Sequence, residues 1–187
     1  LVIYYTVFIL TIVMKGCFVG SGSEGLQQIE ICNCIIKLIN KIPSECNILY
    51  IGTATYDLPG PKYNQTKRFI EIGCNIIEIK CSNINNYNEY SNMKENCEIA
   101  DAIIISGGNT LYAIDAWIKV GLVVHLKEAA NRGVVLTGGS AGAICWFDSG
   151  HSDSDDPETY KIAMLQAAAE AEAEININNN TKNTNQV

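Results

Sequence analysis

Short apolar runs alternate with longer amphipathic segments along most of this chain. The apolar runs are rich in β-branched residues and bounded by Gly, Asn or Asp, which is typical of parallel strands buried on both faces. We expect strands at residues 17–19, 48–51, 76–79, 102–105 and 134–136, and helices at about 25–41, 62–73, 90–99, 110–119 and 122–132. The alternation predicts an α/β fold: a doubly wound, mostly parallel sheet flanked by helices, in a Rossmann-like three-layer sandwich.

The two ends of the chain depart from this pattern. Residues 1–13 are apolar and uncharged, too short to span a bilayer, and lack the basic start and cleavage site of a signal peptide. We expect them to lie outside the fold and hypothesise that Met14 is the natural start. Residues 163–187 join an Ala/Glu helix-like segment to an Asn-rich tract, and we expect disorder from residue 176. The α/β domain is therefore expected at residues 14–162.

Composition narrows the function classes. The 187 residues, 48% of them hydrophobic, suit one domain. A net charge of -7, without a Lys/Arg cluster, argues against a nucleic-acid or membrane partner. The eight cysteines show neither Cys-x-x-Cys pairs nor zinc spacing. We therefore expect a cytoplasmic protein with reduced thiols, no metal and no cofactor, acting on small molecules or peptides.

One serine is placed as a nucleophile would be. Residues 133–142, Gly-Val-Val-Leu-Thr-Gly-Gly-Ser-Ala-Gly, contain the pattern Gly138-x-Ser140-x-Gly142 directly after a predicted strand. In such an elbow the serine stands exposed at a sharp strand-to-helix turn, and the N-terminal N–H groups of the helix face a developing oxyanion. The alternative is a glycine-rich turn with a solvated serine.

Four predicted strands end in loops of small residues, at positions 20–23, 52–55, 106–110 and 137–140. Ligands bind outside the carboxyl ends of parallel strands, so we expect these loops to converge. The N–H groups of Gly108 and Ala141 would then form an oxyanion hole. Asn109 and Thr110 are candidates for substrate binding, with helix capping alone as the alternative.

A glycine pattern keeps a dinucleotide-binding module open as a less favoured alternative. Gly20-x-Gly22-x-x-Gly25 follows a predicted strand and opens a helix. The end of the next strand, residues 51–55, offers no Asp or Glu for a ribose hydroxyl. In a hydrolase the same loop would line the edge of the site.

Four blocks together resemble the peptidase E family of aspartyl dipeptidases: residues 107–111, 132–136, 139–147 and 150–154. The resemblance covers about residues 14–157. It implies a fold similar to class I glutamine amidotransferases and a serine-type dipeptidase or exopeptidase that releases N-terminal Asp from small peptides. It also implies Ser140 as nucleophile, with Gly108 and Ala141 as the oxyanion hole.

The remaining catalytic groups match the family less closely. The resemblance favours Asp155 as the acidic partner, with Asp153 and Asp156 as alternatives. The non-catalytic alternative is that these aspartates form a solvated acidic loop. The family's general-base histidine lies beyond this loop, where the present sequence has none, so we expect a C-terminally truncated family domain. His151 is the candidate substitute base, and His125 is expected to pack in a helix.

These observations leave two main functions open: a serine dipeptidase, or a catalytically inactive relative that binds peptides. Specificity for Asp would need a basic group near the substrate, and Lys62, Lys67 and Arg68 are the candidates. Loss of the C-terminal strands would expose apolar sheet, so we also expect self-association.

Overall fold

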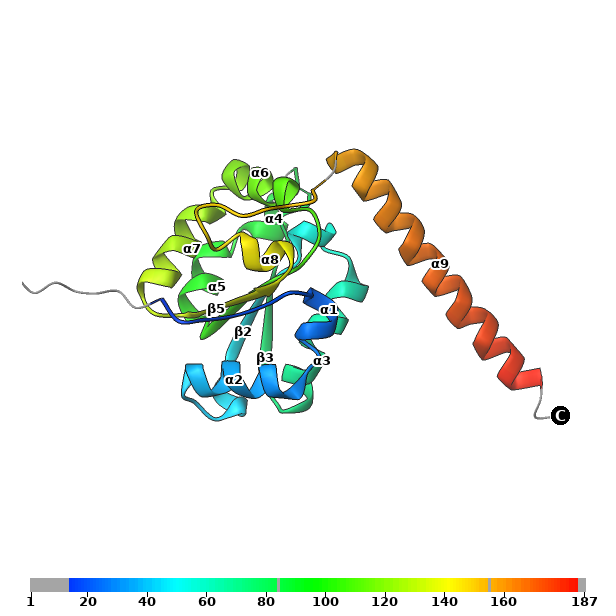
Figure 1. The fold of residues 1–187 in the computed structure, drawn as a ribbon, viewed down its shortest axis with the longest axis horizontal. Coiled ribbons are helices and arrows are strands. Elements are labelled where there is room, and N and C mark those ends of the chain that lie inside the picture. The colour runs from blue at the N-terminus through cyan, green and yellow to red at the C-terminus, as the bar shows by residue number, and fades with distance from the viewer. Residues whose placement is uncertain (1–13, 84, 155, 185–187) are drawn as a thin grey trace, which may run out of the picture.

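Five parallel strands form the centre of the fold (Figure 1). The computed structural model describes residues 14–83, 85–154 and 156–184; the predictions for residues 1–13 and for Asp155 lie outside this part. The strands are β1 (Gly16–Val19), β2 (Asn47–Ile51), β3 (Asn75–Ile79), β4 (Ala102–Ile105) and β5 (Val135–Gly139), in the order β1-β5-β4-β2-β3. All four pairings are parallel, which confirms the predicted fold class.

The helices lie close to the predicted segments. They are α1 (Gly22–Gly25), α2 (Ile29–Ile39), α3 (Pro59–Glu71), α4 (Tyr87–Tyr90), α5 (Met93–Ile99), α6 (Thr110–Val120), α7 (Leu122–Asn131), α8 (Ala141–Ile144) and α9 (Pro157–Thr184), with short 3-10 turns η1 (Pro43–Glu45) and η2 (Thr53–Thr55). The predicted helix at 25–41 is divided between α1 and α2. Leu26, between the two helices, is fully buried in the core.

The alternation of side chains along the central strands builds two cores. Leu49 and Ile103 face a cluster formed with α5, α6 and α7. Ile48 and Ile104, one position away, face a second cluster formed with α2 and α3. Because both faces of the sheet are covered, polar groups that bind ligands must gather at the strand ends.

Helix α9 differs from the sequence-based expectation. Disorder was expected from residue 176, whereas the helix continues to Thr184 and contains the expected domain boundary at residue 162. The Ala- and Glu-rich middle of α9 has high helix propensity, which favours propagation into the Asn-rich end. The hydroxyl of Tyr56 donates to the carbonyl of Pro157 over 2.7 Å and attaches the first turn to the domain, while the rest of α9 extends away (Figure 1).

Candidate active site

Ser140 occupies the turn between β5 and α8. Its backbone has φ 54° and ψ -122°, a conformation that costs energy in a residue with a side chain. Hydrogen bonds on both sides hold it: the Ser140 N–H donates to Val19 O (3.1 Å), and the N–H groups of Ala143 and Ile144 donate to Ser140 O (2.9 and 3.2 Å). The side chain is exposed. The predicted strand, sharp turn and helix are therefore present.

Glycines around the elbow permit close backbone packing. A Cβ atom on Gly142 would overlap the carbonyl of Ile105, and one on Gly138 would overlap the carbonyl of Gly142. At Gly139 it would overlap the backbone of Gly22. Small residues are thus required because β5, β4 and the loop after β1 touch here, with no room for side chains.

The elbow serine opens into a cavity of about 280 Å³. Its described lining comprises Gly20, Ser21, Gly22, Ser23, Thr55, Pro61, Gln65, Gly107, Gly108, Ser140, Tyr160 and Met164. Each of the four small-residue loops contributes to this lining, which confirms that they converge. Helices α3 and α9 complete the wall.

The loop after β4 lies directly beside the elbow. A Cβ atom on Gly107 would lie 3.6 Å from that of Ser140. Gly108 has a φ of +119°, and a side chain there would overlap the carbonyl of Ala54. The N–H of Asn109 donates to that same carbonyl over 2.8 Å and fixes the loop. Gly108 lines the same cavity as Ser140, and Ala141 follows Ser140 directly as the first residue of α8. Their role as an oxyanion hole stays a prediction.

Asn109 and Thr110, the predicted substrate-binding residues, are outside the cavity lining. The Asn109 side chain is buried and accepts the N–H of Tyr112 over 2.8 Å as the N-cap of α6. The Thr110 N–H donates to the Ser154 hydroxyl (2.9 Å), and its own hydroxyl accepts from Ser152 (3.1 Å). Their described contacts fasten loops together, and their role toward substrate stays a prediction.

The acidic loop before α9 gives its carboxylates different surroundings. Asp156 accepts the N–H and hydroxyl of Thr159, both at 3.0 Å, and these bonds hold its pKa below the usual range. It therefore caps α9. The charge of Asp153 acts on Tyr160, which lines the cavity. The carbonyl of Asp156 in turn accepts the N–H of Tyr160 over 2.9 Å. Neither Asp153 nor Asp156 belongs to the described lining of the cavity.

The two histidines also differ. His125 lies on α7, where its Nδ1 is 3.4 Å from a carboxylate oxygen of Glu128, in agreement with a structural position. His151 is exposed in the loop that Ser152 fastens to Thr110. It is outside the described lining of the Ser140 cavity.

The described lining of the cavity contains no carboxylate, histidine, lysine or arginine. Tyr160 is its one ionisable group, and burial raises the pKa of this phenol, so it stays protonated at neutral pH. Nearby Cys145 is no substitute nucleophile, because burial raises the pKa of its thiol to about 12. The general base must therefore approach from outside this lining.

Sequence reasoning missed Gln65. Its side chain is 2% exposed, and its Oε1 has no hydrogen-bond partner within the described residues. It lines the cavity with Ser140, where an amide can bind a peptide group. The signal was available: Gln65 lies four residues before the buried Phe69, so it shares the core face of the predicted helix.

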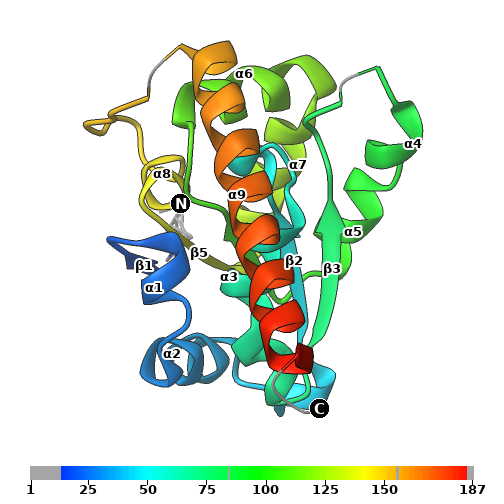
Figure 2. The ribbon, with the colours of Figure 1, turned by 90° about the vertical axis from the view of Figure 1, so that its right-hand side faces the viewer.

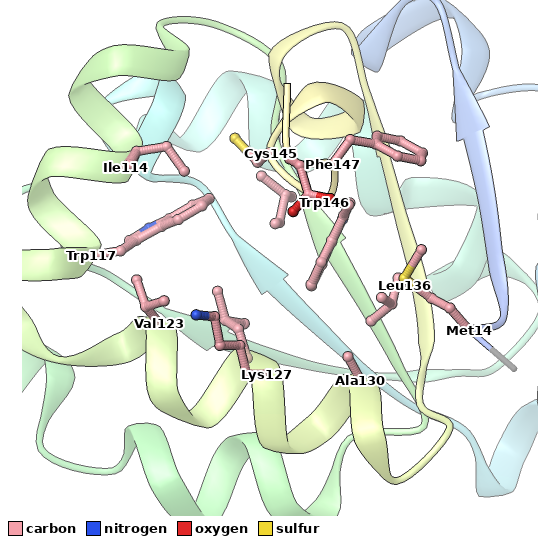
Figure 3. A pocket seen from close by; sticks show the side chains of 13 residues that line it. Met14, Ile114, Trp117, Val123, Lys127, Ala130, Leu136, Cys145, Trp146 and Phe147 are labelled. Carbon is pink, nitrogen blue, oxygen red and sulfur yellow. The ribbon is translucent and has the colours of Figure 1, made fainter. Parts of the chain in front are cut away.

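A separate cavity of about 240 Å³ lies between α6, α7 and the residues after α8 (Figure 3). Its wall is mainly apolar, with Trp117, Trp146 and Phe147 prominent, and Lys127 and Asp148 the charged members. Ser140 is not part of this lining. It is thus a gap between packed side chains, away from the elbow.

Strand order weakens the dinucleotide-binding alternative. In the described sheet β1 pairs only with β5 and forms an edge. The direction in which successive strands are added to the sheet reverses between β2 and β4. A dinucleotide fold places its glycine-rich loop at such a reversal. Here the loop containing Gly20 and Gly22 instead lines the Ser140 cavity.

The fold is α/β, and it places Ser140 at a strand-to-helix elbow. The chain belongs to peptidase family S51, whose family model matches residues 18–179. The family match makes this chain similar to peptidases. Within residues 14–83, 85–154 and 156–184, no helix is both long and apolar enough to cross a membrane, and no cluster of three or more His, Cys, Asp or Glu is arranged to hold a metal.

Two curated relatives match this chain, and one of them is named as a peptidase. The uncharacterized peptidase YgaJ of Bacillus subtilis is 49% identical over 59 residues, 32% of this chain and 26% of that protein. A Trypanosoma brucei brucei protein named G2/mitotic-specific cyclin-1 is 30% identical over 168 residues, 81% of this chain and 49% of that protein. The chain thus spans about half or less of the length of these relatives.

Two solved structures share the fold. One, described as a peptidase E protein of Listeria monocytogenes EGD-e, has a TM-score of 0.55 and 17% identity over 71% of this chain and 61% of that one. The other, a peptidase from an acI-B1 Actinobacterium, has a TM-score of 0.51 and 24% identity, and the match covers 68% of this chain and 54% of that one.

Proposed function

We propose that this chain is a serine-type exopeptidase that hydrolyses small peptides, with Ser140 as the nucleophile. The observation that carries the proposal is the strained backbone of Ser140, held at an exposed elbow beside two glycines of a neighbouring loop. Such strain persists only where the surrounding structure enforces it, and it is concentrated at functional sites.

In the proposed reaction, the Ser140 hydroxyl attacks the scissile carbonyl and passes its proton to a base. The N–H groups of Gly108 and Ala141 stabilise the oxyanion of the tetrahedral intermediate. The carbon–nitrogen bond then breaks, the amine leaves with the proton, and water hydrolyses the acyl-enzyme. His151 is the candidate base within this chain, with Asp153, Asp155 or Asp156 as its acidic partner.

A fluorophosphonate probe tests the nucleophile directly. We expect the probe to label the purified chain and Ser140→Ala to remove the label, because the probe reacts with activated serines. The alanine keeps the Cβ atom and hence the elbow backbone. Ser23→Ala is the matched control, since Ser23 lines the same cavity but is not at an elbow. Labelling that survives in Ser140→Ala would refute the assignment.

A second candidate is a peptide-binding protein without catalysis. The lack of any basic or acidic side chain in the described lining of the cavity favours it, because a serine hydroxyl without a base is a weak nucleophile. Calorimetry with dipeptides distinguishes the two candidates. Binding heat without labelling or turnover would support the second, and labelling of Ser140 with turnover would reject it.

A further inference from the structure

The cavity beside Ser140 adjoins a larger cavity of about 580 Å³ between the start of α3 and α9. Ser23, Pro61 and Met164 line both. Figure 2 shows α9 in front of the domain, and Figure 1 shows that its later turns stand clear of α1 and α3. A molecule bound at Ser140 can therefore extend past these three shared residues into the second space.

The second cavity is apolar. Its remaining described lining comprises Leu58, Pro59, Gly60, Tyr63, Asn64, Ala167 and Ala168. None of these side chains is charged, and Asn64, the Tyr63 hydroxyl and the shared Ser23 are the polar groups. A volume of this size falls in the range of small-molecule sites. A carboxylate placed against this apolar wall would lose part of its hydration without gaining a counter-ion.

The basic residues considered for Asp recognition are engaged elsewhere or lie outside both linings. The Lys62 ammonium contacts the Glu78 carboxylate at 2.6 Å. Arg68 pairs with Glu71 at 2.6 Å and donates to the carbonyl of Gln27. Lys67 is in neither lining. Neither cavity therefore has a described cation to meet an acidic side chain.

We propose that this site takes peptides with an uncharged, apolar side chain next to the scissile bond, and discriminates against acidic ones. The inference rests on the proposed function and names its substrate class. The apolar side chain occupies the cavity between α3 and α9, while the scissile carbonyl lies at Ser140. Transfer of that side chain from water supplies the binding energy.

A panel of dipeptides that differ in one side chain tests this preference. We expect kcat/KM to fall in the order Leu-Xaa, Asn-Xaa, Asp-Xaa, with Leu-Xaa at least about tenfold above Asp-Xaa. The comparison of Asn with Asp changes charge at nearly constant shape. Faster hydrolysis of Asp-Xaa than of both neutral peptides would overturn the inference.

Adding a cation to the second cavity reverses the preference if the side chain binds there. Ala168→Lys places an ammonium in the lining, and we expect the ratio of kcat/KM for Asp-Xaa over Leu-Xaa to rise at least about tenfold. Ala169→Lys is the matched control, because Ala169 is exposed on the same helix and outside the lining. Equal ratios in the two variants would show that the side chain binds elsewhere.

The failure of this inference and that of the proposed function are distinguishable. Fluorophosphonate labelling at Ser140 together with a preference for Asp-Xaa would reject the apolar subsite and keep the peptidase. Without labelling or turnover the peptidase proposal fails, and calorimetry of Leu-Xaa and Asp-Xaa on Ser140→Ala decides the subsite. Tighter binding of Leu-Xaa supports it, and equal or tighter binding of Asp-Xaa overturns it.

Discussion

The two cavities on either side of α8 are built by opposite means. The one beside Ser140 is lined in part by backbone: four glycines from two loops belong to its wall, and a Cβ atom added at Gly108 would overlap the carbonyl of Ala54. The one near Trp117 and Trp146 is formed by large side chains (Figure 3). Backbone N–H groups can reach a ligand only in the first. The contrast shows why the proposed function is assigned to the first cavity.

Helix α8, a single turn, separates the two cavities. Ser140 immediately precedes it, and Cys145, Trp146 and Phe147, which line the apolar cavity, follow it directly. Two potential nucleophiles, a serine and a thiol, thus lie five residues apart in different environments. Experiments that compare them test whether only the first cavity supports catalysis.

Replacement of the two nucleophiles gives the largest expected contrast. We expect Ser140→Ala to lower kcat for the best dipeptide by at least about 10³-fold, because no acyl-enzyme can form. Cys145→Ala should leave kcat within about twofold, since the buried thiol stays protonated. Steady-state kinetics provides the measurement. A large loss in Cys145→Ala alone would invert the assignment of the two cavities.

A second prediction concerns the backbone packing of the elbow. Gly142→Ala is expected to lower the free energy of unfolding by about 3 kcal/mol, because its Cβ would overlap the Ile105 carbonyl. Gly60→Ala is the control: beyond its chain neighbours and its own helix backbone no atom lies within 4 Å of its Cβ. Because Pro61 follows it, the change should lower the free energy of unfolding by no more than about 1 kcal/mol. Urea unfolding followed by circular dichroism measures both, and equal effects would contradict the packing argument.

The next largest expected effect is the loss of kcat on replacing His151. If His151 is the base, His151→Ala lowers kcat by about 10²-fold while peptide binding is retained. His125→Ala should not change kcat, because His125 lies beside Glu128 on α7. Unchanged turnover in His151→Ala would eliminate His151 and require a base from elsewhere.

The smallest expected effect concerns the rate at which Cys145, the thiol in the apolar cavity, is alkylated. With a pKa of about 12, Cys145 is protonated at pH 8 and its alkylation is slow, whereas Cys34 is exposed. The rate at Cys145 should rise with pH toward 12 because the thiolate is the reactive form. Alkylation followed by peptide mass spectrometry measures each site. Modification of Cys145 as fast as Cys34 at pH 8 would show that this cavity is open to solvent.

Sequence patterns were informative where local chemistry decides structure. The apolar runs identified all five described strands, and the glycines around Ser140 indicated the elbow. The division of the segment into α1 and α2 was not predicted, because the apolar pattern continues across it. The surroundings of Lys62 and Arg68 were likewise inaccessible, since their partners depend on how α3 packs. The roles of the candidate site residues stay predictions until the kinetic tests.

Three expectations from the sequence also remain predictions. Light scattering tests self-association, and a monodisperse monomer would contradict it. Mass spectrometry of the native N-terminus tests the start at Met14. Fractionation of cells tests the cytoplasmic location.

The hydrogen bond from Ser140 to Val19 makes the elbow dependent on β1, the edge strand of the described sheet. Edge elements open at a lower free energy than the centre of a sheet. On heating, peptidase activity should therefore disappear before helical signal does, because fraying of four residues frees the turn that bears the nucleophile. The reactive geometry is then only as durable as the most weakly held strand of the domain.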